Sequence, residues 1–260
     1  MYNYHTHTKR CGHASGLDEE YVLKAIEAGY EGIGFSDHVM LPNIINDHIR
    51  GRYEQKEEYL NSIRNLKEKY KDQIDILVGF ECEWDIHYEK YYKDLLDSHQ
   101  VDYLIFGNHS CYFKNGKEYG LKFSSAKAYL KRYLHKTLAA FNSGLFKIMA
   151  HPDLFMFSVP WNEDAAKLSR IICEEAKKHN IILELNCGCI LNNEKQDVFG
   201  EFRYRYPHEE FWKIAKEVGN TIIVGLDAHS PHAFTSPRKQ IMTDLIHRLD
   251  LKVIDKMNIK

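Results

Sequence analysis

Two histidines near the start of the chain, His5 and His7, have the spacing of two ligands for one metal ion. Residues two apart in a β-strand point to the same side, so both imidazoles project together from a predicted strand at 2–7. Imidazole is a common ligand for zinc and other transition metals. The pair alone is weak evidence, because two histidines at this spacing also occur without a function.

Metal-capable or polar side chains also stand at the end of every later strand that the sequence predicts. These residues are Asp37, His38, Glu81, His109, His151, Glu184, Asn186, Asp227 and His229. In a closed βα barrel, the C-terminal ends of the strands form one rim, where the connecting loops converge and the active site lies. We therefore expect a metal site at this rim. The remaining histidines of the helical and loop patterns are expected at the surface: His48, His87, His99, His135, His179, His208, His232 and His247.

The ligand types also indicate the metal. Imidazole with carboxylate suits zinc, iron or manganese. The set is larger than one ion can bind, so we expect two or three divalent ions sharing a bridging carboxylate, an arrangement suited to displacement at a phosphoryl group. No cysteine follows a strand in a spacing that indicates a thiolate site. Cys187 and Cys189 are interpreted as small buried thiols in a turn.

Short apolar runs alternate with longer helical patterns, which is typical of βα units around a parallel sheet. Strands are predicted at 2–7, 32–36, 74–80, 103–107, 147–150, 181–185 and 221–225. Helices are predicted at 18–28, 54–70, 90–98, 125–141, 162–179 and 209–218, with a further helix from Ser236 and a short run at 252–254. Asp18 and Asn162 are predicted N-caps, and Gly29 and Gly144 are predicted helix ends.

This order predicts an α/β fold, a seven-stranded βα barrel that forms a single domain over residues 1–260. The alternative is an open, doubly wound sheet. Such a sheet usually carries a glycine-rich phosphate loop after its first strand, whereas His5, Thr6 and His7 stand at that place here.

Composition excludes several classes of protein. With 44% hydrophobic residues the chain can build a large core, so disorder is excluded. A net charge of −2 argues against binding nucleic acid through bulk positive charge. No apolar run is long enough to cross a membrane, and the N-terminus does not resemble a signal peptide. The six cysteines are consistent with reduced thiols, so we expect a cytoplasmic protein.

These residues resemble the polymerase and histidinol phosphatase (PHP) family of metal-dependent phosphoesterases. The resemblance extends from His5 to about Ser230, and the motifs occur in the family's order. It implies a distorted seven-stranded barrel, (β/α)7, with three metal ions. The implied ligands are His5, His7, Glu81 and Asp227 for one ion, Glu81, His109 and His151 for a second, and His13, His38 and His229 for the third. His13 enters only through this resemblance.

Within the family, the chain is most similar to the stand-alone histidinol-phosphate phosphatase branch, in its length, its Glu184–Asn186 segment and its Tyr206–Pro207 pair. That branch places arginines over the substrate phosphate, and Arg203 and Arg205 are the matching candidates. The choice between the two arginines stays open. The residues at 191–201 depart from the pattern of the branch, so the resemblance supports these arginines less directly than it supports the metal ligands.

The resulting functional prediction is a metal-dependent phosphate monoester hydrolase that converts L-histidinol phosphate and water to L-histidinol and phosphate in histidine biosynthesis. Glu81, Asp227 and His229 are the predicted catalytic residues, and Glu83 or Asp153 could meet the positive end of the substrate. The alternatives are a nuclease or nucleotide phosphoesterase of the same family, and a metal-binding domain without activity. A small phosphate monoester is the expected partner, rather than a membrane or a nucleic acid, and the oligomeric state stays open.

Overall fold

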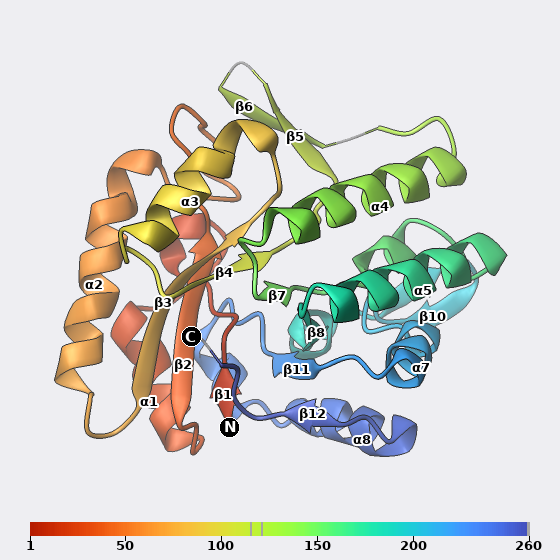
Figure 1. Ribbon diagram of the computed structural model, residues 1–260. Helices are drawn as coiled ribbons and strands as arrows, with labels where there is room; N and C mark the ends of the chain where they lie inside the picture. The colour runs from red at the N-terminus through yellow and green to blue at the C-terminus, as the bar shows by residue number, and fades with distance from the viewer. Residues whose placement is uncertain (115, 121, 259–260) are drawn as a thin grey trace.

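A curled parallel sheet with helices packed around its outside forms the centre of the computed structural model, which describes residues 1–114, 116–120 and 122–258 (Figure 1). The sheet has the order β1-β2-β3-β4-β7-β8-β11-β12, and every pair of neighbours is parallel. Its strands are β1 (Tyr2–Asn3), β2 (Gly32–His38), β3 (Asp75–Cys82), β4 (Tyr103–Phe106), β7 (Ile148–Met149), β8 (Ile182–Asn186), β11 (Ile222–Gly225) and β12 (Val253–Ile254). The predicted distorted βα barrel is therefore confirmed.

The sheet contains eight strands instead of the predicted seven. The eighth is β12, which forms from the short run after the last helix and pairs with β11. The two ends of the sheet also meet. Thr6 forms a parallel bridge with Ala228, and the Tyr2 amide donates to the carbonyl of Asp255 over 3.0 Å. The first strand is shorter than predicted, since β1 ends at Asn3 and the chain from His5 to His7 follows it as an irregular extension.

The predicted helices occur in the predicted order, and the structure adds the short helix α6 (Gly188–Leu191), which was not predicted. The other α-helices are α1 (Asp18–Glu27), α2 (Lys56–Lys69), α3 (Glu89–Asp97), α4 (Ala126–Ser143), α5 (Glu163–Lys178), α7 (Glu209–Val218) and α8 (Lys239–Leu249). Short 3₁₀ helices cover Lys9–Cys11, Tyr53–Gln55, Ile86–Tyr88, Leu154–Phe157 and Pro231–Thr235. The Asn162 side chain accepts from the Ala165 amide and caps α5 as predicted, and Gly144 ends α4 in the left-handed conformation.

The N-cap prediction for Asp18 is wrong. Helix α1 begins at Asp18 itself and Leu17 precedes it. The Asp18 carboxylate instead binds the Arg10 guanidinium through two hydrogen bonds of 2.8 and 2.9 Å and accepts from the Ser62 hydroxyl. A bidentate charge-assisted pair is stronger than a neutral cap, which explains the choice of partner.

Two hairpins that the sequence analysis did not identify interrupt the βα alternation. The strands β5 (Cys111–Lys114) and β6 (Lys117–Gly120) form the first, between β4 and α4. The strands β9 (Gln196–Val198) and β10 (Glu201–Arg203) form the second, between α6 and α7. In Figure 1 the β5–β6 hairpin stands at the upper edge, beyond the end to which β2 points. It therefore lies on the side of the molecule where the parallel strands end.

Strands buried on both faces carry long apolar runs, and all seven residues of β2 are buried. The larger core lies between the sheet and the helices. A smaller cluster fills the inside of the curled sheet and includes Tyr4, Tyr103, Ile105, Ile148 and Ile223. Both cores together fix the strand ends in space.

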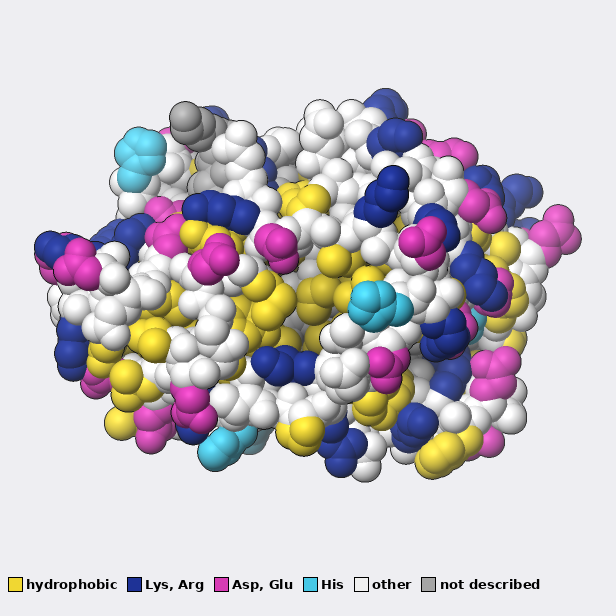
Figure 2. Space-filling view, turned by 90° about the horizontal axis from the view of Figure 1, so that it is seen from below, with side chains coloured by type: hydrophobic (Ala, Val, Ile, Leu, Met, Phe, Trp, Pro, Cys, Tyr) yellow, Lys and Arg dark blue, Asp and Glu magenta, His cyan; other side chains and the backbone are white. Residues whose placement is uncertain are grey.

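The face in Figure 2 is seen from below Figure 1, at the end of the sheet opposite to these strand ends. Acidic and basic side chains are interspersed over it, without a continuous basic stripe (Figure 2). The described residues contain no helix that is both long and apolar enough to span a membrane.

Tyr103 needs glycine at the strands beside it. Its hydroxyl donates to the Tyr4 carbonyl over 2.6 Å, and a Cβ at Gly34 would lie 2.2 Å from that hydroxyl oxygen. We predict that Gly34→Ala lowers the free energy of unfolding by about 1–3 kcal/mol through overpacking. Tyr103→Phe removes the atom that collides, so the double variant should lose less stability than the two single losses added together. Urea unfolding of the four proteins measures this coupling, and strictly additive losses would contradict the packing argument.

Candidate metal centre

Four side-chain atoms converge at the C-terminal end of the sheet. His5 Nε2 and His7 Nε2 lie 3.0 Å apart. His5 Nε2 lies 3.4 Å from Glu81 Oε2 and 3.4 Å from Asp227 Oδ1, and the corresponding distances from His7 Nε2 are 3.5 and 3.2 Å. Four ligands about 2.1 Å from one tetrahedral ion would lie roughly 3.4 Å from one another. The arrangement therefore fits a four-ligand site for a cation, and we name these four residues the first ligand group.

A second ligand group uses the other oxygen of the same carboxylate. Glu81 Oε1 lies 3.1 Å from His151 Nε2 and 3.3 Å from His109 Nε2, and the two imidazole nitrogens lie 3.3 Å apart. Glu81 is almost fully buried, with 1% of its surface exposed. Its two oxygens thus face two separate sets of imidazoles, as a carboxylate that bridges two ions must.

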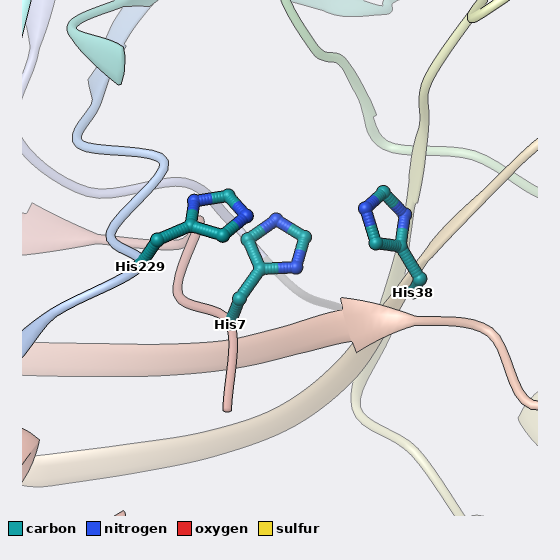
Figure 3. A group of neighbouring side chains, drawn as sticks. All are labelled: His7, His38 and His229. Atoms are coloured by element: carbon teal, nitrogen blue, oxygen red, sulfur yellow. The ribbon is translucent and has the colours of Figure 1, made fainter. Parts of the chain in front are cut away.

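A third group of histidines adjoins the first. His13 Nε2 and His229 Nε2 lie 2.9 Å apart, and the rings of His13 and His38 have centroids 5.6 Å apart. Figure 3 shows the His7 and His229 rings side by side, with His38 at the end of strand β2. The ligand atoms of His7, His38 and His229 lie within 4.8 Å of one another. The structure thus brings all nine predicted ligands to one end of the sheet.

Acceptor atoms behind four of the seven histidine ligands set the direction of those imidazoles. His5 Nδ1 lies 2.9 Å from Glu184 Oε1, and His109 Nδ1 lies 2.8 Å from Glu83 Oε1. Each Nδ1 is thereby engaged as a donor, which leaves the Nε2 lone pair for a metal. His13 and His229 use backbone carbonyls in the same way, those of Cys11 and Asp227. Such pairing of a ligand with an outer acceptor is typical of metal-binding histidines.

Glycine makes room for two of the carboxylates. A Cβ at Gly107 would lie 2.4 Å from Glu81 Oε1, and a Cβ at Gly225 would lie 1.8 Å from Glu184 Oε1. His151 and Asp227 both have positive φ, 29° and 51°, which is uncommon for residues other than glycine. Backbone strain of this kind collects at functional sites because the surrounding structure must hold it in place.

The electrostatics of the first two groups favour added positive charge. Burial alone would lower the pKa of His5, but the charges of Glu184, Asp227 and Glu81 outweigh it and hold that pKa well above its usual value. Burial would raise the pKa of Glu81, but His109, His5 and His38 keep it well below its usual range. A field that stabilises a proton on imidazole also stabilises a divalent cation, which competes with the proton for the same nitrogen.

The third group has a different character. Burial lowers the pKa of His38 well below its usual value, and burial together with His7 lowers the pKa of His229 to about 4. Both imidazoles are therefore neutral near pH 7, the form in which histidine binds a metal. Fewer carboxylates contribute here, so the third group carries less negative charge than the first two.

Cys11 is a neighbour of the ligands that the sequence analysis missed. Its sulfur lies within 4.8 Å of ligand atoms of His13 and His229, and also of ligand atoms of His7 and Asp37. Cys11 ends a 3₁₀ turn, and Gly12, in the left-handed conformation, follows it. No sequence periodicity covers this turn, so no pattern could have indicated the cysteine. Cys187 and Cys189 are buried as expected, and burial raises the pKa of both thiols. The predicted turn is wrong, because Cys187 precedes the short helix α6 and Cys189 lies within it.

The two candidate arginines have different surroundings. Arg203 donates to the backbone carbonyls of Tyr204, Arg205 and Met156 over 2.8 to 3.1 Å. A pocket opens at the metal centre, and Arg205 lines it together with most of the proposed ligands. The guanidinium carbon of Arg205 lies 4.6 Å above the centre of the Phe157 ring. The structure thus places Arg205 beside the metal centre and commits Arg203 to holding the backbone.

The surroundings of three further residues differ from what was expected of them. His208 was expected at the surface, but it is buried with 7% exposure and stacks on Trp161. His48 is exposed, yet it lines the pocket of the metal centre. Asp153, a candidate for meeting the substrate, is fully buried and accepts from the His208 amide and the Trp212 indole. Burial raises the pKa of Asp153 to about 6.

Comparison with known proteins agrees with this fold and site. Residues 3–188 match the PHP domain family, so the chain belongs to the PHP domain family. A protein of Deinococcus radiodurans named "Probable histidinol-phosphatase" is 25% identical over 232 residues, which cover 87% of this chain and 85% of that protein. A Schizosaccharomyces pombe protein of the same name is 23% identical over 259 residues, which cover 88% of this chain and 80% of that protein.

Solved structures show the same fold. The HisK protein of Listeria monocytogenes superposes with a TM-score of 0.73 at 22% identity, over 92% of this chain and 99% of the other. Histidinol phosphate phosphatase of Lactococcus lactis, solved with zinc, L-histidinol and phosphate, superposes with a TM-score of 0.68 at 17% identity. That match covers 97% of this chain and 95% of the other.

Removal of the Glu81 charge should do more damage than removal of one histidine. Two cations held close together repel each other, and a bridging anion reduces that repulsion. We predict that Glu81→Gln loses at least one equivalent of bound metal and nearly all metal-dependent turnover. His229→Ala should weaken only the third group and keep measurable turnover at high metal concentration. Elemental analysis and kcat for both variants test this order, and a Glu81→Gln protein that keeps its full metal content would contradict the bridge.

Proposed function

We propose that the chain is a metal-dependent phosphate monoester hydrolase that cleaves L-histidinol phosphate to L-histidinol and phosphate, with Glu81 as the bridge between two of two to three divalent ions. The observation that carries the proposal is the convergence of two ligand groups on the two oxygens of Glu81. The ligand set of imidazoles and carboxylates suits zinc, iron or manganese. Relatives named "Probable histidinol-phosphatase", of which this chain covers 85% and 80%, support the choice of substrate.

The pocket at the metal centre suits a small molecule. Its volume is about 510 Å³, within the usual range for a small-ligand site. Eight of the nine proposed ligands line this pocket, and His5 is the exception. Arg205 and Tyr206 line it as well. A phosphate group at the ligands would therefore meet Arg205 at the wall.

Hydrolysis forms a bond between a water oxygen and phosphorus and breaks the bond from phosphorus to the ester oxygen, which leaves as an alcohol. Negative charge is redistributed over the phosphoryl oxygens and the leaving oxygen on the way. When bound, divalent ions supply Lewis-acid chemistry, because they lower the pKa of water and neutralise phosphate charge.

The chain's own residues position these parts. Asn186 donates to Asp227 Oδ2 over 3.3 Å and to Glu184 Oε2 over 2.7 Å, so one amide orients a ligand and the carboxylate behind another ligand. The Phe157 ring supports the flat face of the Arg205 guanidinium and leaves its edge N–H groups for phosphate oxygens. A fixed cation at this wall stabilises the charge that develops during transfer.

The two arginines allow a matched test of this arrangement. We predict that Arg205→Ala lowers kcat/KM by roughly 10²-fold or more, because it removes charge stabilisation beside the metal centre. Arg203→Ala removes an equal charge from the same segment, but its donors serve backbone carbonyls. It should lower the unfolding temperature and change kcat/KM by less than about tenfold. Full turnover in Arg205→Ala would refute its role.

The function itself is tested by phosphate release from L-histidinol phosphate, beside a dinucleotide as the nuclease control. We expect release from the monoester and no cleavage of the dinucleotide by the metal-loaded protein. Cleavage of the dinucleotide alone would indicate a nuclease, and the absence of both activities would indicate a metal-binding domain without catalysis.

A further inference from the structure

The pocket of the metal centre has a second wall that the ligands do not explain. Asn46, His48 and Ile49 from the loop after β2 line it, together with Cys111, Glu118 and Gly120 from the β5–β6 hairpin. Among the described residues of this pocket, four carry carboxylates: Glu81, Glu83, Glu118 and Asp227. Glu81 and Asp227 belong to the ligand groups, so Glu83 and Glu118 are the two whose charges need another explanation.

A single buried arginine connects these two carboxylates. Arg50 has 1% of its surface exposed, and its Nη2 lies 2.8 Å from Glu83 Oε2 and 2.9 Å from Glu118 Oε2. Its Nη1 donates to the carbonyl of Val39 over 2.8 Å. One guanidinium therefore faces two carboxylates, and the three side chains together carry one excess negative charge beside the pocket.

Both oxygens of Glu83 are already engaged by charged or polar partners, and its side chain is buried, with 2% exposed. One of its oxygens accepts from His109 Nδ1 and the other accepts from Arg50. Burial would raise the pKa of Glu83, but Arg50 outweighs it and keeps the pKa well below its usual range. The sequence analysis named Glu83 and Asp153 as groups that could meet the positive end of a substrate, and the structure commits both to internal partners.

Glu118 is in a different position. The hydrogen bonds that it accepts from Arg50 and Asn46 all fall on Oε2, at 2.9, 3.1 and 3.2 Å. Among the described residues, the other hydrogen-bond partner of the Glu118 carboxylate is the thiol of Cys111, a weak donor. A carboxylate accepts at both oxygens, so Glu118 keeps acceptor capacity for a cationic group at this wall.

We propose that Glu118 is a specificity-determining residue that binds the ammonium group of the substrate's leaving alcohol. The pocket has a cation, Arg205, and an acceptor anion, Glu118, among its lining residues. This pair of charges matches a phosphate ester of an amino alcohol, which is negative at one end and positive at the other. The inference rests on the proposed function and adds the group that selects among phosphate monoesters.

The test compares two esters that differ only in the amine. L-Histidinol phosphate carries the ammonium group, and 3-(imidazol-4-yl)propyl phosphate lacks it. We expect Glu118→Gln to lower kcat/KM for the first ester by roughly 10- to 100-fold, as for one charge-assisted hydrogen bond, and to leave the second nearly unchanged. The loss should appear mainly in KM, because the ammonium is remote from the reacting phosphorus. Glu118→Asp, which keeps the charge, should recover part of the preference.

Glu209→Gln is the matched control, since Glu209 also pairs with an arginine, Arg248, but lies outside this pocket. It should leave both esters unaffected. If Glu118→Gln lowers both esters by the same factor, or neither, Glu118 only supports the hairpin and the inference is overturned. A wild-type protein that hydrolyses neither ester would refute the proposed function, and the inference with it. If instead the wild-type protein is active and Glu118→Gln keeps its preference for the ester with the ammonium group, the inference fails and the proposed function stands.

Discussion

The structure of this site depends on one buried carboxylate between two groups of imidazoles. Glu81 has 1% of its surface exposed, so bulk solvent stabilises its charge only weakly and nearby positive charge must do so. His5 and His7 lie beside one oxygen, and His109 and His151 lie beside the other. Bound cations would meet the same requirement more strongly than protonated imidazoles do, because each brings two charges to the shared anion.

Much of the barrel serves to hold that carboxylate and its partners at fixed positions. Strand β3 carries Glu81 among strands buried on both faces, and Gly107 at the end of β4 leaves space for its head group. Glu184 on β8 holds His5 in place through a hydrogen bond to its Nδ1 atom, and Gly225 on β11 leaves space for the Glu184 carboxylate. A substitution at either glycine would therefore disturb the metal centre without removing any ligand.

Strand ends could be predicted from the sequence because two simple rules determine them. Apolar runs mark buried parallel strands, and the C-terminal ends of parallel strands meet at one edge. His38, Glu81 and Asp227 follow from these rules alone. His13 does not, because it lies beyond a 3₁₀ turn and the left-handed Gly12, where no periodicity operates. Its identification needed the resemblance to the family.

The other omissions have a similar origin. Glu118 lies in a hairpin of two four-residue strands, too short to give a pattern, and Arg50 lies in a long loop. Their relation appears only when the chain folds and brings residues 68 positions apart into contact. Arg203 and Arg205 could not be distinguished by sequence either, since their difference lies in whether carbonyls or a pocket surround each guanidinium.

The most direct measurement of the central claim is anomalous X-ray diffraction from crystals of the metal-loaded protein. The account predicts one metal peak among His5, His7, Glu81 and Asp227, and a second among Glu81, His109 and His151, with one oxygen of Glu81 at each. A single peak bound by only one oxygen of Glu81, with His109 and His151 free of metal, would contradict it.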